Sequence, residues 1–166
     1  VLDIVEAKVQ KDPATIPLAQ KTQIMDEYNE IIWKTPKIQT SNLGYSDMHR
    51  KVIFANSEGS YIEQIKPDVT LRMSVVAREG GDVQQAHISL GSNGEFGLVE
   101  GLQHQVEVMA KKAVQLLSAP RVKGGEYTVI CDPVLAGVFA HEAFGHLSES
   151  DHVYENDKLR EIMVLG

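Results

Sequence analysis

Residues 37–90 alternate between apolar and polar side chains, and this pattern constrains the fold more than any other feature of the chain. An apolar period of two is typical of strands that bury one face, and the polar and glycine-containing segments between the apolar runs are typical of tight turns. The predicted strands are 37–45, 50–55, 60–66, 68–79 and 83–90, with turns at 56–59, 67–68 and 80–82. We therefore expect a five-stranded antiparallel β-meander.

Two flanking segments have the apolar spacing of amphipathic helices. The first helix is predicted at residues 17–34 and the second at 103–118, and each is followed by a proline that stops it. Residues 91–101 contain four glycines and are expected to form a loop. The apolar faces of the helices comprise Ile24, Tyr28, Ile31 and Ile32 in the first, and Val106, Met109, Ala113, Leu116 and Leu117 in the second. Helices packed on one face of an antiparallel sheet make an α+β fold, here a two-layer sandwich.

Composition narrows the class of protein. With 166 residues, 43% of them hydrophobic, the chain is long enough to bury one core. Its formal net charge of −7 argues against direct binding to DNA or RNA. No apolar run approaches the roughly 20 residues that a membrane-spanning helix requires, and the chain begins without a secretory signal pattern. The single cysteine cannot form an internal disulfide, so we expect a cytoplasmic protein without membrane contact.

Near the C-terminus, His141, Glu142 and His146 place two imidazoles around one carboxylate. Imidazole is a common zinc ligand, and a neighbouring carboxylate is suited to taking a proton from metal-bound water. On a regular helix, residues i and i+5 lie roughly 140° apart around the axis. Both rings therefore reach one ion only if the backbone inserts a wide i to i+5 turn or breaks, and Gly145 is the residue expected to permit this. By itself, the spacing leaves a metal site and a chance surface arrangement equally open.

The residues before the motif predict a strand that leads into a capped helix. Residues 126–131 have the composition of a buried strand, and Cys131 at its end is expected to be a buried structural thiol. Asp132 as N-cap and Pro133 as first helical residue predict a helix over 133–148 that carries the motif. The side of this helix that we expect to be buried carries Val134, Leu135, Val138 and Phe139.

Other polar residues near the motif allow two interpretations. Glu149, Asp151 and His152 follow it directly, and they either complete the coordination shell of an ion or belong to a solvated loop. Two histidines are too few for a catalytic zinc, which usually takes three protein ligands. The remaining histidines, His49, His87 and His104, are expected to be ordinary surface or core-edge residues.

Several segments, in their order along the chain, resemble the TldD/PmbA family, whose members are often labelled modulators of DNA gyrase. They are residues 12–15, 55–59, 75–78 and, above all, the histidine motif at 141–146. The resemblance is to the TldD branch, because the PmbA (TldE) branch typically lacks the histidines. It implies a zinc metallopeptidase that cleaves short or unfolded peptides and pairs as a TldD and TldE heterodimer or as a homodimer.

The resemblance also implies roles for individual residues. His141 and His146 are similar to the two zinc-binding histidines of the family, and Glu142 is similar to its general base. The remaining family ligand is a cysteine of a C-terminal domain, which this chain lacks. The chain therefore resembles one N-terminal α+β domain, residues 1–166, with the motif helix at its end. This leaves the activity of the fragment open.

Peptide hydrolysis is the implied reaction. Glu142 would take a proton from a zinc-activated water as the water attacks the amide carbonyl, and would then pass the proton to the leaving amine. A hypothesis of another class stays open beside it. In that alternative, the chain is a non-catalytic assembly module that binds an unfolded peptide or a partner protein through an exposed sheet edge.

Overall fold

The computed structural model describes residues 1–162, and the chain divides into two compact units. The first unit, Val1–Arg121, contains the β-sheet and two long helices. The second unit begins at Val122 and contains the histidine motif. The expectation of a single domain over residues 1–166 stays a prediction.

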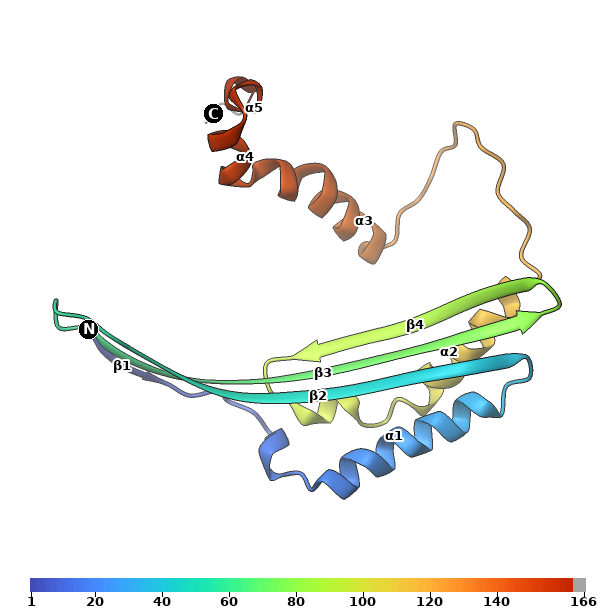
Figure 1. Cartoon of the computed structure of the whole chain (residues 1–166), viewed down its shortest axis with the longest axis horizontal. Coiled ribbons are helices and arrows are strands. Elements are labelled where there is room, and N and C mark those ends of the chain that lie inside the picture. Colours follow the sequence, from blue (N-terminus) through green and yellow to red (C-terminus); the bar gives the residue numbers. More distant parts are fainter. Residues whose placement is uncertain (163–166) are drawn as a thin grey trace. The chain divides into compact units, whose positions relative to one another are not determined.

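A four-stranded sheet forms the first layer of the first unit (Figure 1). The longest strand, β3, lies inside the sheet and pairs with all three others. It is antiparallel to β2 on one edge, and on its other edge it is parallel to β1 and antiparallel to β4. The bounds are β1 Leu2–Val5, β2 Ile38–Ala55, β3 Tyr61–Glu79 and β4 Asp82–Ser92. The α+β class is thus confirmed, with the short parallel strand β1 as an addition that the sequence pattern did not predict.

The predicted meander has too many strands, and of its pairings only 50–55 with 60–66 and 68–79 with 83–90 are present. Its turns at 56–59 and 80–82 are present, and Gly59 and Gly80 adopt the positive φ angles of 84° and 59° that these turns require. The runs 37–45 and 50–55, however, are one continuous strand. The residues between them contain no glycine or proline and remain paired with β3, so nothing interrupts the ladder.

The turn predicted at residues 67–68 is also absent, and Pro67 lies inside β3. On this edge of β3, the pairing with β1 ends at Gln64 and the pairing with β4 begins at Val69. Pro67 lies between them and therefore has a neighbouring strand, β2, on one side only. Proline is tolerated at such an edge position, where no ladder donor is needed. Gly94 packs closely against the Pro67 ring. A Cβ atom at Gly94 would lie 2.3 Å from Cγ of Pro67, so a larger residue would not fit there.

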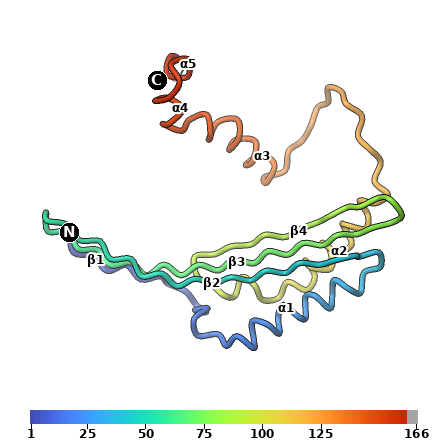
Figure 2. Tube along the Cα trace, in the orientation of Figure 1, coloured from blue at the N-terminus to red at the C-terminus, as the bar shows by residue number. Residues whose placement is uncertain are grey.

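Two helices, α1 (Leu18–Trp33) and α2 (Gln103–Leu116), form the second layer and cover one face of the sheet (Figures 1 and 2). Both lie within two residues of their predicted bounds. Alternate residues of β3, from Val69 to Ala77, are buried beneath them, as a period of two requires. The buried helix residues are Tyr28 and Ile32 of α1, and Val106, Met109, Ala110 and Ala113 of α2.

The segment predicted as a loop at residues 91–101 is more ordered than expected. After the end of β4 it contains a short 3-10 helix, η2 (Phe96–Val99), whose two terminal side chains are fully buried. The carboxylate of Glu95 fixes its entry by accepting hydrogen bonds from the backbone N–H groups of Gln10 and Gly97, at 2.7 and 3.0 Å. This segment therefore joins the N-terminal residues to the core.

The second unit is helical. Its elements are α3 (Pro133–Ala140), η3 (His141–Gly145), η4 (His146–Ser148), α4 (Ser150–Glu155) and α5 (Asp157–Ile162). A helical segment over 133–148 is thus present as predicted. Among residues 1–162, none of the helices combines the length and the apolar character that crossing a membrane requires.

Three expectations for the second unit are wrong. Residues 126–131 form no strand, because no strand in the described part of the chain pairs with them, and Ile130 is 99% exposed. Cys131 is exposed rather than buried, since the strand that would cover it is not formed. The side of α3 expected to be buried is exposed as well, because the described part of this unit offers no second layer. Its residues are Val134, Leu135, Val138 and Phe139.

Candidate metal centre

Asp132 and Pro133 start the helix that carries the motif, as the sequence predicts. The Oδ1 atom of Asp132 accepts a hydrogen bond from the backbone N–H of Leu135 at 2.8 Å, and Pro133 occupies the first helical position. The cap satisfies one of the N–H groups that a helix leaves unpaired at its start. From there α3 continues without a break into His141.

The wide turn that the spacing requires is present at the motif. Residues His141–Gly145 form one turn of π-helix, and the N–H of His146 donates to the carbonyl oxygen of His141, five residues earlier. Gly145, in contrast, has ordinary helical angles, φ −57° and ψ −57°. A Cβ there would lie 3.9 Å from the nearest atom, the carbonyl oxygen of Ala140. Gly145 therefore permits the turn without a backbone angle that only glycine favours, because this turn is made from helical angles that any residue adopts.

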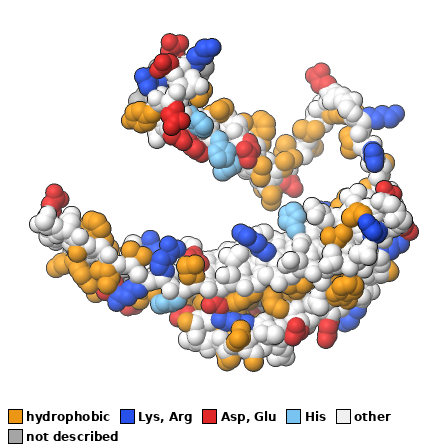
Figure 3. All heavy atoms as spheres, viewed as in Figure 1, with side chains coloured by type: hydrophobic (Ala, Val, Ile, Leu, Met, Phe, Trp, Pro, Cys, Tyr) orange, Lys and Arg blue, Asp and Glu red, His pale blue; other side chains and the backbone are white. Residues whose placement is uncertain are grey.

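The turn brings the two imidazole rings together. The ring centroids of His141 and His146 are 4.4 Å apart and their planes cross at 79°. One ligand atom from each of His141, Glu142 and His146 lies within 4.8 Å of the others. The Nε2 atom of His146 lies 3.9 Å from Oε2 of Glu142. All three side chains are exposed, and histidine and acidic side chains gather on this unit in Figure 3.

The donor set fits zinc. Two imidazoles and a carboxylate are borderline and hard ligands of the kind that zinc takes, and their closeness in the structure requires no refolding of the backbone. Cys131 is not among these donors. It precedes α3, and among the described residues it belongs to no cluster of histidine and acidic side chains. The candidate centre therefore consists of two imidazoles with one carboxylate beside them.

The residues that follow the motif form a separate group. One ligand atom from each of Glu149, Asp151 and His152 lies within 4.8 Å of the others, and all three side chains are exposed. Glu149 also contacts the first group, because its Oε1 atom lies 2.6 Å from Nδ1 of His146. The sequence analysis predicted Glu149 to be either a metal ligand or a loop residue, and it did not predict this contact. The i, i+3 spacing of His146 and Glu149 was a signal for the contact, because it places two side chains on one side of a helical turn.

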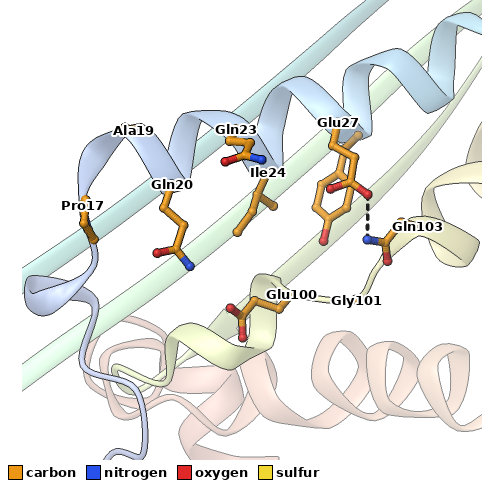
Figure 4. A pocket seen from close by; sticks show the side chains of 10 residues that line it. Pro17, Ala19, Gln20, Gln23, Ile24, Glu27, Glu100, Gly101 and Gln103 are labelled. Carbon is orange, nitrogen blue, oxygen red and sulfur yellow. Dashed lines mark hydrogen bonds between the residues drawn. The ribbon is translucent and has the colours of Figure 1, made fainter.

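The other three histidines lie in the first unit. His49, His87 and His104 belong to β2, β4 and α2, and all are exposed, in keeping with the expectation of ordinary surface residues. A groove in this unit runs between α1 and the start of α2 (Figure 4). Across it Nε2 of Gln103 donates a hydrogen bond to Oε1 of Glu27 at 2.9 Å, and the described residues that line it include no histidine or cysteine.

An α+β layer followed by a helix with two converging histidines and an adjacent glutamate is an arrangement of the kind that metallohydrolases use. Residues 11–119 match the family profile described as "PmbA/TldA metallopeptidase central domain". The chain belongs to this family of metallopeptidases, the TldD/PmbA family. The description assigns the matched residues to a central domain, where the resemblance implied an N-terminal one.

Named relatives agree with this assignment. A metalloprotease of Synechocystis is 43% identical over 157 residues, which cover 94% of this chain and 34% of the relative. A metalloprotease of Methanothermobacter thermautotrophicus is 31% identical over 164 residues, covering 96% of this chain and 36% of the relative. A "Zinc metalloprotease TldD homolog" of Saccharolobus solfataricus is 32% identical over 117 residues, which cover 70% of this chain and 26% of the relative. The chain thus spans about a third of the length of the first two relatives.

Proposed function

We propose that the full-length protein is a zinc metallopeptidase that hydrolyses peptide bonds in short or unfolded peptides. The observation that carries this proposal is the π-turn, which brings the rings of His141 and His146 to a centroid distance of 4.4 Å beside the carboxylate of Glu142. The names of the relatives favour a hydrolase over the non-catalytic binding module, and one of them includes zinc.

In this proposal His141 and His146 hold the zinc ion. Zinc in such a site acts as a Lewis acid and makes water acidic enough to lose a proton near neutral pH. A third protein ligand is expected outside this chain, because catalytic zinc usually takes three. By the family resemblance, this ligand is a cysteine of the C-terminal portion.

Glu142 is the proposed general base. Its carboxylate takes the proton of the attacking water and transfers it to the amine nitrogen as the C–N bond breaks. The side chains of Glu142 and His146 are 65% and 48% exposed, so a peptide has access to both within this unit. The attacking water and the leaving amine would both lie beside Glu142, so one carboxylate would be able to serve both transfers.

The partner and the location belong to the same proposal. We infer a homodimer, or a heterodimer with a TldE/PmbA-like subunit, in the cytoplasm. The net charge of −7 supports the expectation that the protein does not bind nucleic acid directly.

The variant Glu142→Gln in the full-length protein tests the mechanism. Glutamine keeps the size of the side chain but accepts no proton, so peptide hydrolysis should fall by at least about 100-fold, the usual contribution of a positioned base. Zinc content should stay that of the unaltered protein. His104→Ala, an exposed histidine of the first unit, is the matched control and should keep both. Retention of hydrolysis by Glu142→Gln would remove Glu142 from the mechanism.

A further inference from the structure

The two ring nitrogens of His146 face different carboxylates. Nε2 lies 3.9 Å from Oε2 of Glu142, whereas Nδ1 lies 2.6 Å from Oε1 of Glu149. Since the two nitrogens are on different edges of the imidazole, Nε2 faces the candidate metal centre and Nδ1 faces away from it. Glu149 is therefore bound to the edge of His146 that the zinc ion does not need.

Hydrogen-bond chemistry fixes which nitrogen carries the proton. An ionised carboxylate only accepts hydrogen bonds, so Nδ1–H of His146 is the donor to Glu149. A neutral imidazole has one N–H, and with Nδ1 protonated the lone pair is on Nε2. The contact with Glu149 thus selects the tautomer in which the nitrogen that faces Glu142 is free to bind a metal.

The backbone holds Glu149 in place for this contact. Glu149 leaves the helical turn with φ −68° and ψ 135°, and its own N–H donates to the carbonyl oxygen of His146 at 3.3 Å. Main chain and side chain of Glu149 both bind His146, so the carboxylate has little freedom to turn away. Ligand histidines in proteins are generally held by such a carboxylate or carbonyl on their second nitrogen.

We propose that Glu149 is a positioning residue, which holds His146 in the Nδ1–H tautomer and directs Nε2 at the zinc ion without binding the ion itself. The proposal rests on the proposed zinc site at His141 and His146. It gives Glu149 a role other than the two that the sequence left open, a metal ligand or a residue of a solvated loop. The carboxylate oxygen that binds Nδ1 does not reach an ion on the opposite edge of the ring.

Zinc affinity of the full-length protein, measured by competition with a chromogenic chelator, tests the proposal. Glu149→Ala should weaken zinc binding about 10- to 100-fold, the usual cost of losing such a partner. Glu149→Gln should lose less, because its amide oxygen still accepts from Nδ1–H. Glu155→Ala is the matched control. It removes an exposed carboxylate of α4, outside both clusters, and it should keep the affinity of the unaltered protein.

The tautomer gives a second measurement that does not depend on activity. In zinc-free protein with ¹⁵N-labelled histidine, the imidazole signals of His146 should be those of a ring protonated at Nδ1, and Glu149→Ala should abolish this preference. His146→Ala identifies the signals by their disappearance. A purely structural role for Glu149 would change the melting temperature but not the tautomer.

The two proposals fail in different ways. Unaltered zinc affinity in Glu149→Ala, or an equal loss in Glu155→Ala, overturns the positioning role and leaves the zinc site intact. A full-length protein that binds no zinc, or that keeps it after His146→Ala, overturns both.

Discussion

The main-chain N–H of His146 donates to the carbonyl oxygen of His141, and this i to i+5 hydrogen bond matches the spacing of five residues between the two histidines. A regular α-helix would place these residues on different sides. The wider turn brings the fifth residue back over the first, and the rings meet at a centroid distance of 4.4 Å. The i, i+5 spacing of the histidines in the sequence is thus matched by one widened turn of the backbone.

Replacing Gly145 with alanine should leave this turn intact. Gly145 has helical angles, and the new methyl group would meet only ordinary contacts, at 3.9 Å from the Ala140 carbonyl oxygen and 4.0 Å from Nδ1 of His141. Alanine favours a helix over glycine by up to about 1 kcal/mol, so the melting temperature should be unchanged or higher. The zinc content of the full-length protein should also be unchanged. Gly145→Pro, which removes a backbone donor, should abolish zinc binding. Zinc loss in a folded Gly145→Ala protein would contradict the prediction.

Asp132→Ala should destabilise the start of α3. The substitution removes the acceptor of the Leu135 N–H at 2.8 Å, and loss of an N-cap typically costs about 1 kcal/mol. Amide hydrogen exchange in the first turn of α3 should become faster by a factor of about five. Asp132→Asn keeps a capping oxygen and serves as the control. Equal exchange in both variants would show that the cap contributes nothing.

Tyr28→Phe should destabilise the first unit by about 1–3 kcal/mol. The buried hydroxyl of Tyr28 donates to the carbonyl oxygen of Val99 at 2.6 Å and accepts from the N–H of Leu102 at 3.1 Å. Burial also raises the pKa of this hydroxyl, which keeps it protonated and able to donate. Phenylalanine leaves both backbone groups without their partner. The free energy of unfolding, measured with denaturant, is the readout. Tyr127→Phe loses an exposed bond to Lys123 and should change little.

Glu95 should make folding stability depend on pH in the acidic range. Hydrogen bonds from the backbone N–H groups of Gln10 and Gly97 hold the pKa of Glu95 below its usual value in the folded protein. A lowered folded pKa means that the carboxylate contributes fully above the unfolded pKa, near 4.3, and that this contribution is lost as pH falls through the folded value. The melting temperatures of the unaltered protein and of Glu95→Gln should therefore differ most near neutral pH and converge below about pH 4. A difference that is constant from pH 7 to pH 3 would exclude this role.

Local patterns were sufficient where the physical cause is local. The bounds of α1 and α2 follow from apolar spacing and from the prolines beyond them, and the start of α3 follows from Asp132 and Pro133. The wide turn at His141 follows from the geometry of an i, i+5 pair. The spacing did not show which backbone angles make the turn, and the structure shows ordinary helical angles at Gly145.

By itself, the sequence determined the helices, the α+β class and the position of the histidine motif, because helix spacing and capping depend on neighbours along the chain. Only the tertiary structure decided that β3 continues through Pro67, that Phe96 and Val99 enter the core, and that residues 126–131 stay unpaired. A strand needs the hydrogen bonds of a partner that is distant in sequence, so its presence and length depend on what lies beside it. The contact between His146 and Glu149 is local, since it joins residues three apart, but the structure was needed to show where the chain turns after the helix and so places the carboxylate on Nδ1.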